Sequence, residues 1–338
     1  MEEEIINDGW LPEPNGIRET DYIAGKASGI EFEDRVSDTN WTPYLPDDER
    51  QHINGVETMS CVTFSALNDC EMGGNYLLAH NRFSDEARTF FLNHGYIVNG
   101  KFNFSDKFIA ILSGTTKEGN YLTKVLDTIR TVGLIPESML PADNPKTWEE
   151  YHNPNQITQA MLDLGKESLK YLLVQYEWVY TPDMSKGETI DQLHSRIYVQ
   201  MRQAPFQLAK NGHATALYLA VYKNKWGQFE TYNPFRRELP WTTPLPYIMK
   251  IVVSSRNEYT EQEIADAKKF ALDLVKTKPS RIGFRYEKNG ESYRIELDGS
   301  LKYKNATPSP LFTALCEDGT IWGINEQTWS KLKPALIK

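Results

Sequence analysis

Hydrophobic positions in the first half of the chain recur with helical spacing. The clearest case is 120–132, where apolar residues return every three or four positions and Gly133 follows as a helix-ending signal. The apolar stripe consists of Leu122, Val125, Leu126, Ile129 and Val132. A second helix is predicted from Cys61 onward, because Cys61, Phe64 and Leu67 share one face, and Gly73 with Gly74 is expected to stop it.

The pattern changes from helix to strand further along the chain. Two more helices are predicted over 156–166 and 189–203, and the aromatic, apolar run 171–180 between them is typical of a buried strand. The runs 213–222 and 226–232 follow, separated by three polar residues, and this arrangement predicts a β-hairpin. The sequence therefore predicts an α+β fold whose helices precede its antiparallel strands.

The composition along the chain suggests three regions. Residues 1–40 are rich in Pro, Gly and acidic residues, which predicts an extended N-terminal arm lying across a domain. The main domain is expected over 41–255. Residues 256–338 are expected to form a small, β-rich accessory module of a helix near 260–276 and short hairpins. The hairpin signals are the dipeptides Asn289-Gly290, Asp298-Gly299 and Asp318-Gly319.

Charge and cysteine content narrow the class of partner and compartment. The 338 residues carry a net charge of −9, which repels phosphate backbones and argues against nucleic acid. Three cysteines (Cys61, Cys70 and Cys316) are too few for a disulfide framework and suit a reducing compartment. The acidic N-terminus resembles no signal peptide and no apolar run is long enough to span a membrane, so a cytoplasmic location is expected. Neither a phosphate-binding loop nor a metal-ligand spacing is evident, and we expect no cofactor and no metal.

A cysteine at the start of a helix is a candidate nucleophile. The unpaired N–H groups and dipole of a helix N-terminus favour the thiolate, which is the reactive form. Such a nucleophile needs an imidazole within hydrogen-bonding reach and a third polar side chain to orient that imidazole. Spacing alone does not identify these partners.

The ordered set of motifs between 40 and 240 resembles the papain-like cysteine peptidases. Residues 58–66 are similar to the family's signature around the nucleophile, with Ser60-Cys61 and Phe64-Ser65-Ala66 matching and Val62 in place of an aromatic residue. The stretch 104–108 also resembles a family motif. His213, which lies 152 residues after Cys61, opens an apolar strand, and Glu230-Thr231-Tyr232 stands where the family has Asn-Ser-Trp. With an acidic residue at this position, the chain resembles the members of the family that phages and prophages encode.

This resemblance implies a papain-like fold, with a helical half opened by the Cys61 helix and an antiparallel β half carrying His213. It also implies Cys61 as nucleophile, His213 as general base and Gln51 as oxyanion donor together with the Cys61 backbone N–H. Gln51 stands ten residues before Cys61, so a small loop insertion is expected between them. Glu230 is expected to orient His213, with Asn233 as the alternative.

The function expected from this resemblance is a cysteine peptidase that cleaves peptide or isopeptide bonds, with a protein or peptide as substrate. Acyl transfer to an amine would use the same residues. The alternative is a catalytically silent papain-like protein with a structural or adaptor role in a virion or other assembly. In either case the arm or residues 256–338 are candidate surfaces for an assembly partner, and incorporation in a virion is an alternative location.

Overall fold

The computed structural model divides the chain into two compact units. One unit comprises Met1–Gly16 and Asp34–Ser255, and the other Ile17–Glu33 and Arg256–Lys338. The structure describes residues 9–14, 16–18, 21, 23, 34–142, 144–184 and 187–255, together with the backbone of 283–288, 291–296 and 301–304. The helix expected at 260–276 and the hairpin expected at Asp318-Gly319 lie outside these described residues.

The larger unit combines helices with antiparallel sheets, as the sequence predicted. Its helices are α1 (Cys61–Ala79), α2 (Asp85–Asn93), α3 (Asp106–Leu112), α4 (Leu122–Val132), α5 (Trp148–Tyr151), α6 (Gln159–Ser168) and α7 (Ile190–Gln200). Single 3-10 turns occur at Thr42–Tyr44, Glu137–Met139, Pro154–Gln156 and Pro182–Met184. Within the described part of the chain, no helix is long and apolar enough to cross a membrane.

One six-stranded antiparallel sheet dominates the strands of this unit, in the order β5-β10-β6-β7-β8-β9. Its strands are β5 (Leu172–Tyr180), β6 (Phe206–Lys210), β7 (His213–Val221), β8 (Lys225–Phe229), β9 (Arg236–Pro240) and β10 (Tyr247–Ser255). Two short hairpins are formed by β1 (His52–Ile53) with β2 (Val56–Glu57), and by β3 (Ile97–Val98) with β4 (Lys101–Phe102).

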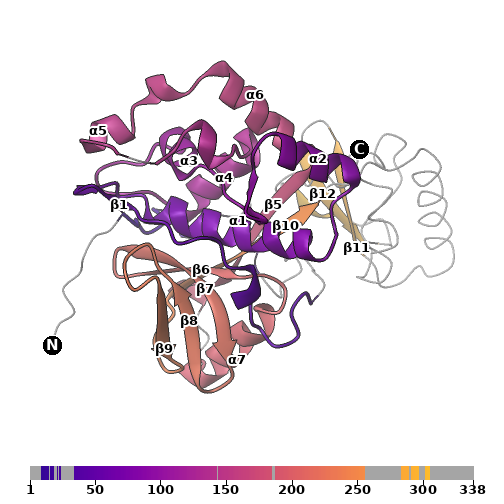
Figure 1. Ribbon diagram of the computed structural model, residues 1–338. Coiled ribbons are helices and arrows are strands. Elements are labelled where there is room, and N and C mark those ends of the chain that lie inside the picture. Colours follow the sequence, from indigo (N-terminus) through magenta and orange to yellow (C-terminus); the bar gives the residue numbers. More distant parts are fainter. Residues whose placement is uncertain are drawn as a thin grey trace. The chain divides into compact units, whose positions relative to one another are not determined.

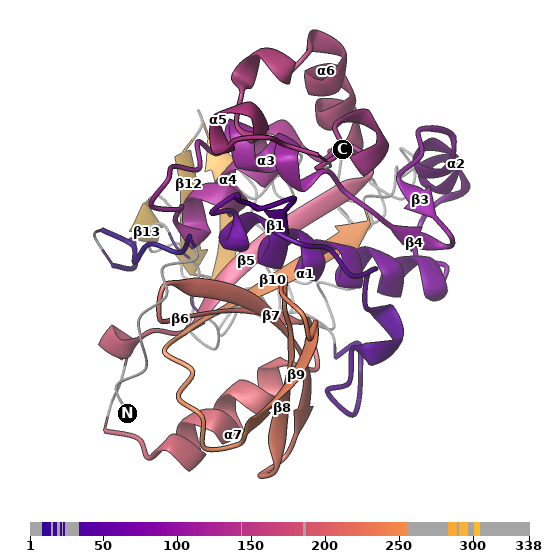
Figure 2. The same ribbon diagram turned by 60° about the vertical axis from the view of Figure 1, so that its left-hand side comes forward.

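Helix α1 forms the centre of the larger unit. It runs between α3 and α4 on one side and the strands β6 to β9 on the other (Figures 1 and 2). It packs most extensively on β7 and β10. Every residue of α1 from Cys61 to Leu77 is buried, so the helix is covered on all sides and not only along one apolar stripe. This central packing holds the first turn of α1 in a fixed position.

The prediction that Gly73 and Gly74 end this helix is wrong. The helix continues through both residues to Ala79. A Cβ atom on Gly73 would lie 2.8 Å from Val253 Cβ on β10, and one on Gly74 would lie 2.8 Å from the ring of Phe102. The two glycines therefore allow close packing on both sides of the helix. This packing outweighs the free-energy cost of glycine in a helix, which is about 1 kcal/mol per residue relative to alanine.

The local signals elsewhere correspond to elements of the structure. The apolar stripe at 120–132 forms α4, which ends at Val132 and is followed by Gly133 with φ of 76°. The run 171–180 forms β5, and the predicted hairpin is β7 paired with β8. In the second unit, β11 (Gly283–Lys288), β12 (Glu291–Glu296) and β13 (Leu301–Lys304) form an antiparallel three-stranded sheet.

Candidate active site

Cys61 is the first residue of α1 and is fully buried. The preceding residue, Ser60, makes no side-chain cap and instead donates its hydroxyl to the Thr58 carbonyl at 3.1 Å. The first turn contains no acidic residue, so the positive end of the helix dipole is not neutralised there. The Ala214 N–H also donates to Cys61 Sγ at 3.3 Å. The sulfur therefore lies at the N-terminal end of the helix and accepts a main-chain hydrogen bond from β7.

His213 begins β7 directly after a tight turn. Asn211 and Gly212 both have positive φ, 53° and 78°, which suits the two-residue turns that join twisted antiparallel strands. The side chain of His213 is only 16% exposed. Because β7 packs against α1, the turn places His213 near the N-terminal end of the helix, and Cys61 is among the groups that raise the pKa of its imidazole.

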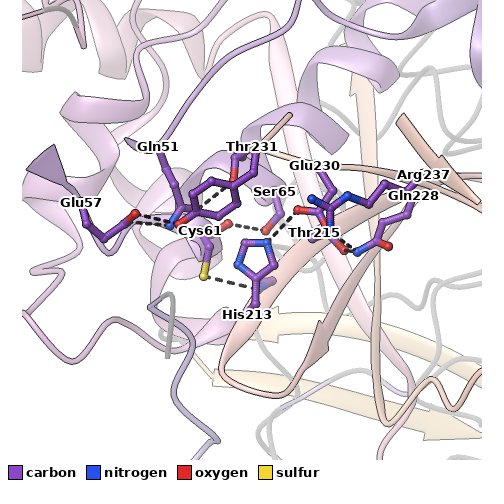
Figure 3. A network of polar contacts seen from close by, with 12 residues as sticks. Gln51, Glu57, Cys61, Ser65, His213, Thr215, Gln228, Glu230, Thr231 and Arg237 are labelled. Atoms are coloured by element: carbon purple, nitrogen blue, oxygen red, sulfur yellow. Dashed lines mark hydrogen bonds and ion pairs between the residues drawn. The ribbon is translucent and has the colours of Figure 1, made fainter. Parts of the chain in front are cut away.

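Glu230 binds the other side of the imidazole. His213 Nε2 lies 2.8 Å from Glu230 Oε2, and the Glu230 side chain is 4% exposed (Figure 3). Burial lowers the pKa of His213, but hydrogen bonds and charges from Cys61 and Glu230 outweigh it and raise the pKa to about 10. A pKa raised this far favours the imidazolium form of the ring at neutral pH, beside the Glu230 carboxylate.

The strand register explains why Glu230 reaches His213. Val221 pairs with Lys225 at the turn end of the hairpin, but the pairing slips by one residue between Leu217 and Leu219, so that Ala216 pairs with Phe229. Continued by one residue, this register sets Glu230 opposite Thr215. Since Thr215 and His213 are two residues apart on one strand, they share a face, and Glu230 becomes a diagonal neighbour of the imidazole. Without the slip, Glu230 would fall on the opposite face.

Further contacts hold the Glu230 carboxylate in place. Gln228 Nε2 donates to Glu230 Oε1 at 2.7 Å and to Thr215 Oγ1 at 2.9 Å. Arg237 Nη1 lies 3.8 Å from the same carboxylate oxygen. Asn233, the alternative orienting residue, is exposed in the turn between β8 and β9. The structure thus brings Glu230, and not Asn233, to the imidazole.

Gln51 is buried, and both ends of its amide have a partner of matching polarity. Its Nε2 donates to Glu57 Oε1 at 2.7 Å, and its Oε1 accepts from Thr231 Oγ1 at 2.8 Å. An ionised carboxylate only accepts hydrogen bonds, so Glu57 fixes which end of the amide carries the N–H groups. The residues inserted between Gln51 and Cys61 form the β1–β2 hairpin, which ends at Glu57. Thr231, adjacent to Glu230, connects Gln51 to the His213 side of the site (Figure 3).

Several supporting residues were not predicted from the sequence. Glu57 also accepts hydrogen bonds from the Met59 N–H at 2.9 Å and from the Tyr232 hydroxyl at 2.7 Å. Tyr232 packs against the ring of His213, with the ring centroids 5.6 Å apart. Gln207, on β6, donates to the Val62 carbonyl at 2.8 Å and so braces the first turn of α1. No local motif marks these residues, because most of their partners are distant in the sequence.

The other groups near the site do not suggest a second centre. Cys70 is fully buried on α1, and burial together with the charges of Asp69 and Glu71 raises the pKa of its thiol well above the ordinary value. Such a thiol is unreactive at neutral pH. Among the described residues, no group of three or more His, Cys, Asp or Glu side chains could hold a metal ion.

Comparison with known proteins gives a limited result. No protein-family model matches the sequence, and no curated protein matches it significantly. Among solved structures, the chain is similar to xylellain, a cysteine protease from Xylella fastidiosa, with a TM-score of 0.45 and 13% sequence identity. The match covers 72% of this chain and 95% of xylellain. At this level of similarity, the function has to be inferred from the residues of the site itself.

Proposed function

We propose that this protein is a cysteine-type peptidase that cleaves peptide or isopeptide bonds through an acyl-enzyme. The observation that supports it most directly is the position of His213, whose Nε2 lies 2.8 Å from Glu230 Oε2 and whose neighbour in the chain, Ala214, donates its N–H to Cys61 Sγ at 3.3 Å. A buried thiol, imidazole and carboxylate in this order are the parts that nucleophilic catalysis by cysteine requires. The raised pKa of His213 favours the imidazolium form at neutral pH.

Each residue has a defined role in the proposed reaction. The Cys61 sulfur attacks the carbonyl carbon, and the oxyanion accepts hydrogen bonds from the Cys61 backbone N–H and from Gln51 Nε2. The C–N bond breaks as the His213 imidazolium gives its proton to the leaving amine. The neutral imidazole then takes a proton from water, and the resulting hydroxide cleaves the thioester. Release of the acid restores the thiolate and the imidazolium, which Glu230 stabilises throughout.

Hydrolysis of fluorescently labelled casein by the full chain tests this proposal. Cys61→Ser and His213→Gln should each lower the rate by about 10³-fold or more, as for other members of catalytic triads. Cys70→Ala is the matched control on the same helix and should retain activity. Turnover that persists in Cys61→Ser would contradict the proposal. Absence of turnover in a folded wild-type chain and in all variants would favour the alternative, a silent structural or adaptor protein of a virion or other assembly.

A further inference from the structure

The turn that leads into α1 contains a residue in an unfavourable backbone conformation. Met59 has φ of 57°, in the left-handed region that residues with a side chain rarely adopt. A conformation of this kind persists only where surrounding contacts hold it. Two residues further on, Cys61 opens the helix, so its N–H has no acceptor within α1. The direction of this N–H, which is a donor of the proposed oxyanion site, therefore depends on the turn around Met59.

One of the contacts that hold this turn comes from His152, the residue directly after α5. Its Nε2 lies 2.8 Å from the Thr58 carbonyl oxygen. Since a carbonyl only accepts hydrogen bonds, Nε2 carries the hydrogen and is the donor. Thr58 is fully buried, and the same carbonyl also accepts from the Ser60 hydroxyl at 3.1 Å. The peptide group between Thr58 and Met59 is thus fixed through its oxygen.

The imidazole of His152 is held in place by two aromatic rings of α5. Trp148, four residues earlier, stacks on it with ring centroids 4.3 Å apart and an interplanar angle of 29°. Tyr151 meets it edge-on, with ring centroids 4.8 Å apart. Burial of His152, together with the positive charge of Lys107, lowers its pKa to about 4, although the hydrogen bond to Thr58 opposes this shift. At neutral pH the ring is therefore uncharged, with its one N–H directed at Thr58.

We propose that His152 is a positioning residue, which holds the Thr58 carbonyl and so keeps Met59 in its left-handed conformation. The Cys61 N–H is thereby directed at the oxyanion that forms when the sulfur attacks a carbonyl group. This inference rests on the proposed function, since it assigns a role at the same site. His152 acts through the turn and not on the reacting atoms. Displacement of a group in an active site by about 1 Å can cost about 10²-fold in rate, so loss of this hydrogen bond should be measurable.

Two reagents that modify Cys61 separate this role from the general reactivity of the thiol. With p-nitrophenyl acetate, the thiolate attacks the ester carbonyl and an oxyanion forms. The C–O bond to nitrophenolate then breaks and leaves an acetyl thioester on Cys61. Iodoacetamide is attacked at a saturated carbon, from which iodide leaves, and no oxyanion forms. The ratio of the acylation rate to the alkylation rate, measured by peptide mapping at about pH 7, therefore reports on the oxyanion site and cancels changes in thiolate content.

Three variants of the full chain make the comparison specific. His152→Phe keeps an aromatic ring against Trp148 but cannot donate to Thr58, whereas His152→Gln retains an N–H donor. His194→Phe is the matched control, because His194 on α7 is also a buried imidazole, set edge-on against two tryptophan rings. Its Nδ1 lies 2.5 Å from a carbonyl oxygen, but that oxygen belongs to Trp241, which follows β9. The control thus removes the same kind of hydrogen bond without touching the turn before α1.

His152→Phe should lower the ratio of acylation to alkylation roughly tenfold, because the Cys61 N–H loses its alignment. His152→Gln should restore most of that loss, and His194→Phe should leave the ratio unchanged. An unchanged ratio in His152→Phe would overturn the inference, and so would an equal loss in His152→Gln or in His194→Phe.

The ratio does not require hydrolysis of a peptide, so it separates this inference from the proposed function. In casein hydrolysis, His152→Phe should lower kcat with little change in KM, because the oxyanion exists only after attack. A lowered ratio in His152→Phe, in a chain whose wild type hydrolyses no casein, would support the positioning role and count against the peptidase function. Casein hydrolysis by His152→Phe with the kcat of the wild type, together with an unchanged ratio, would do the reverse.

Discussion

Replacement of Glu230 by glutamine should lower the pKa of His213 while preserving the shape of the site. The carboxylate is 4% exposed and 2.8 Å from Nε2, so it acts on the imidazolium with little screening by water. A hydrogen bond to a charged group contributes about 1.5–3 kcal/mol, and 1.36 kcal/mol corresponds to one pKa unit, so the loss is about 1–2 units. The pKa of His213 should fall from about 10 to about 8 or 9.

The assay is an NMR titration of labelled histidine, in which His213→Gln identifies the signal. A raised pKa in the folded state contributes stability that is fully present below about pH 6.5 and is lost as the pH rises toward 10. In Glu230→Gln that loss, and the basic limb of any hydrolysis profile, should both move to lower pH. Asn233→Ala is the control and should leave the titration unchanged. A wild-type midpoint near 6.5, or no shift in Glu230→Gln, would refute the reasoning.

Three further predictions concern residues that support the site and the core. Glu57→Gln should let the Gln51 amide rotate and lower kcat by about 10²-fold with little change in KM, because the oxyanion donor acts in the transition state. An increase in KM of the same size would indicate a different role. Burial raises the pKa of Asp69 well above its usual value, so Asp69→Asn should gain stability relative to wild type as the pH rises above about 4, measured by urea unfolding. Glu177→Gln leaves the buried Lys250 without its ion-pair partner and should cost about 3–5 kcal/mol in the same assay, whereas a loss below about 1 kcal/mol would contradict this.

Local patterns predicted the elements that the periodicity of their own residues specifies. The stripe that forms α4 and the turn-separated apolar runs that form β7 and β8 depend on periodicity, which is present in the sequence. The extent of α1 was mispredicted because its two glycines serve contacts with Val253 and Phe102, which are distant in the chain. A glycine pair has the same appearance in sequence whether it stops a helix or lets it pack closely.

The candidate site was predicted through a resemblance, and its geometry depends on features that no spacing reveals. The structure places Cys61, His213 and Glu230 together, yet the face on which Glu230 falls is decided by a one-residue slip between Leu217 and Leu219. The Gln51 amide is fixed by Glu57 and Thr231, which come from separate parts of the chain. Contacts of this kind arise only when the tertiary structure forms.

The most direct test of the central claim is the selectivity of alkylation within one sample. Cys61, Cys70 and Cys316 compete for iodoacetamide at about pH 6, where an ordinary thiol is mostly protonated. Peptide mapping over time should show Cys61 modified roughly tenfold faster than the other two, and His213→Gln should remove most of that difference, because the imidazolium stabilises the thiolate. Cys61 reacting no faster than Cys70, or reacting equally fast in His213→Gln, would contradict the assignment of Cys61 and His213 as a catalytic pair.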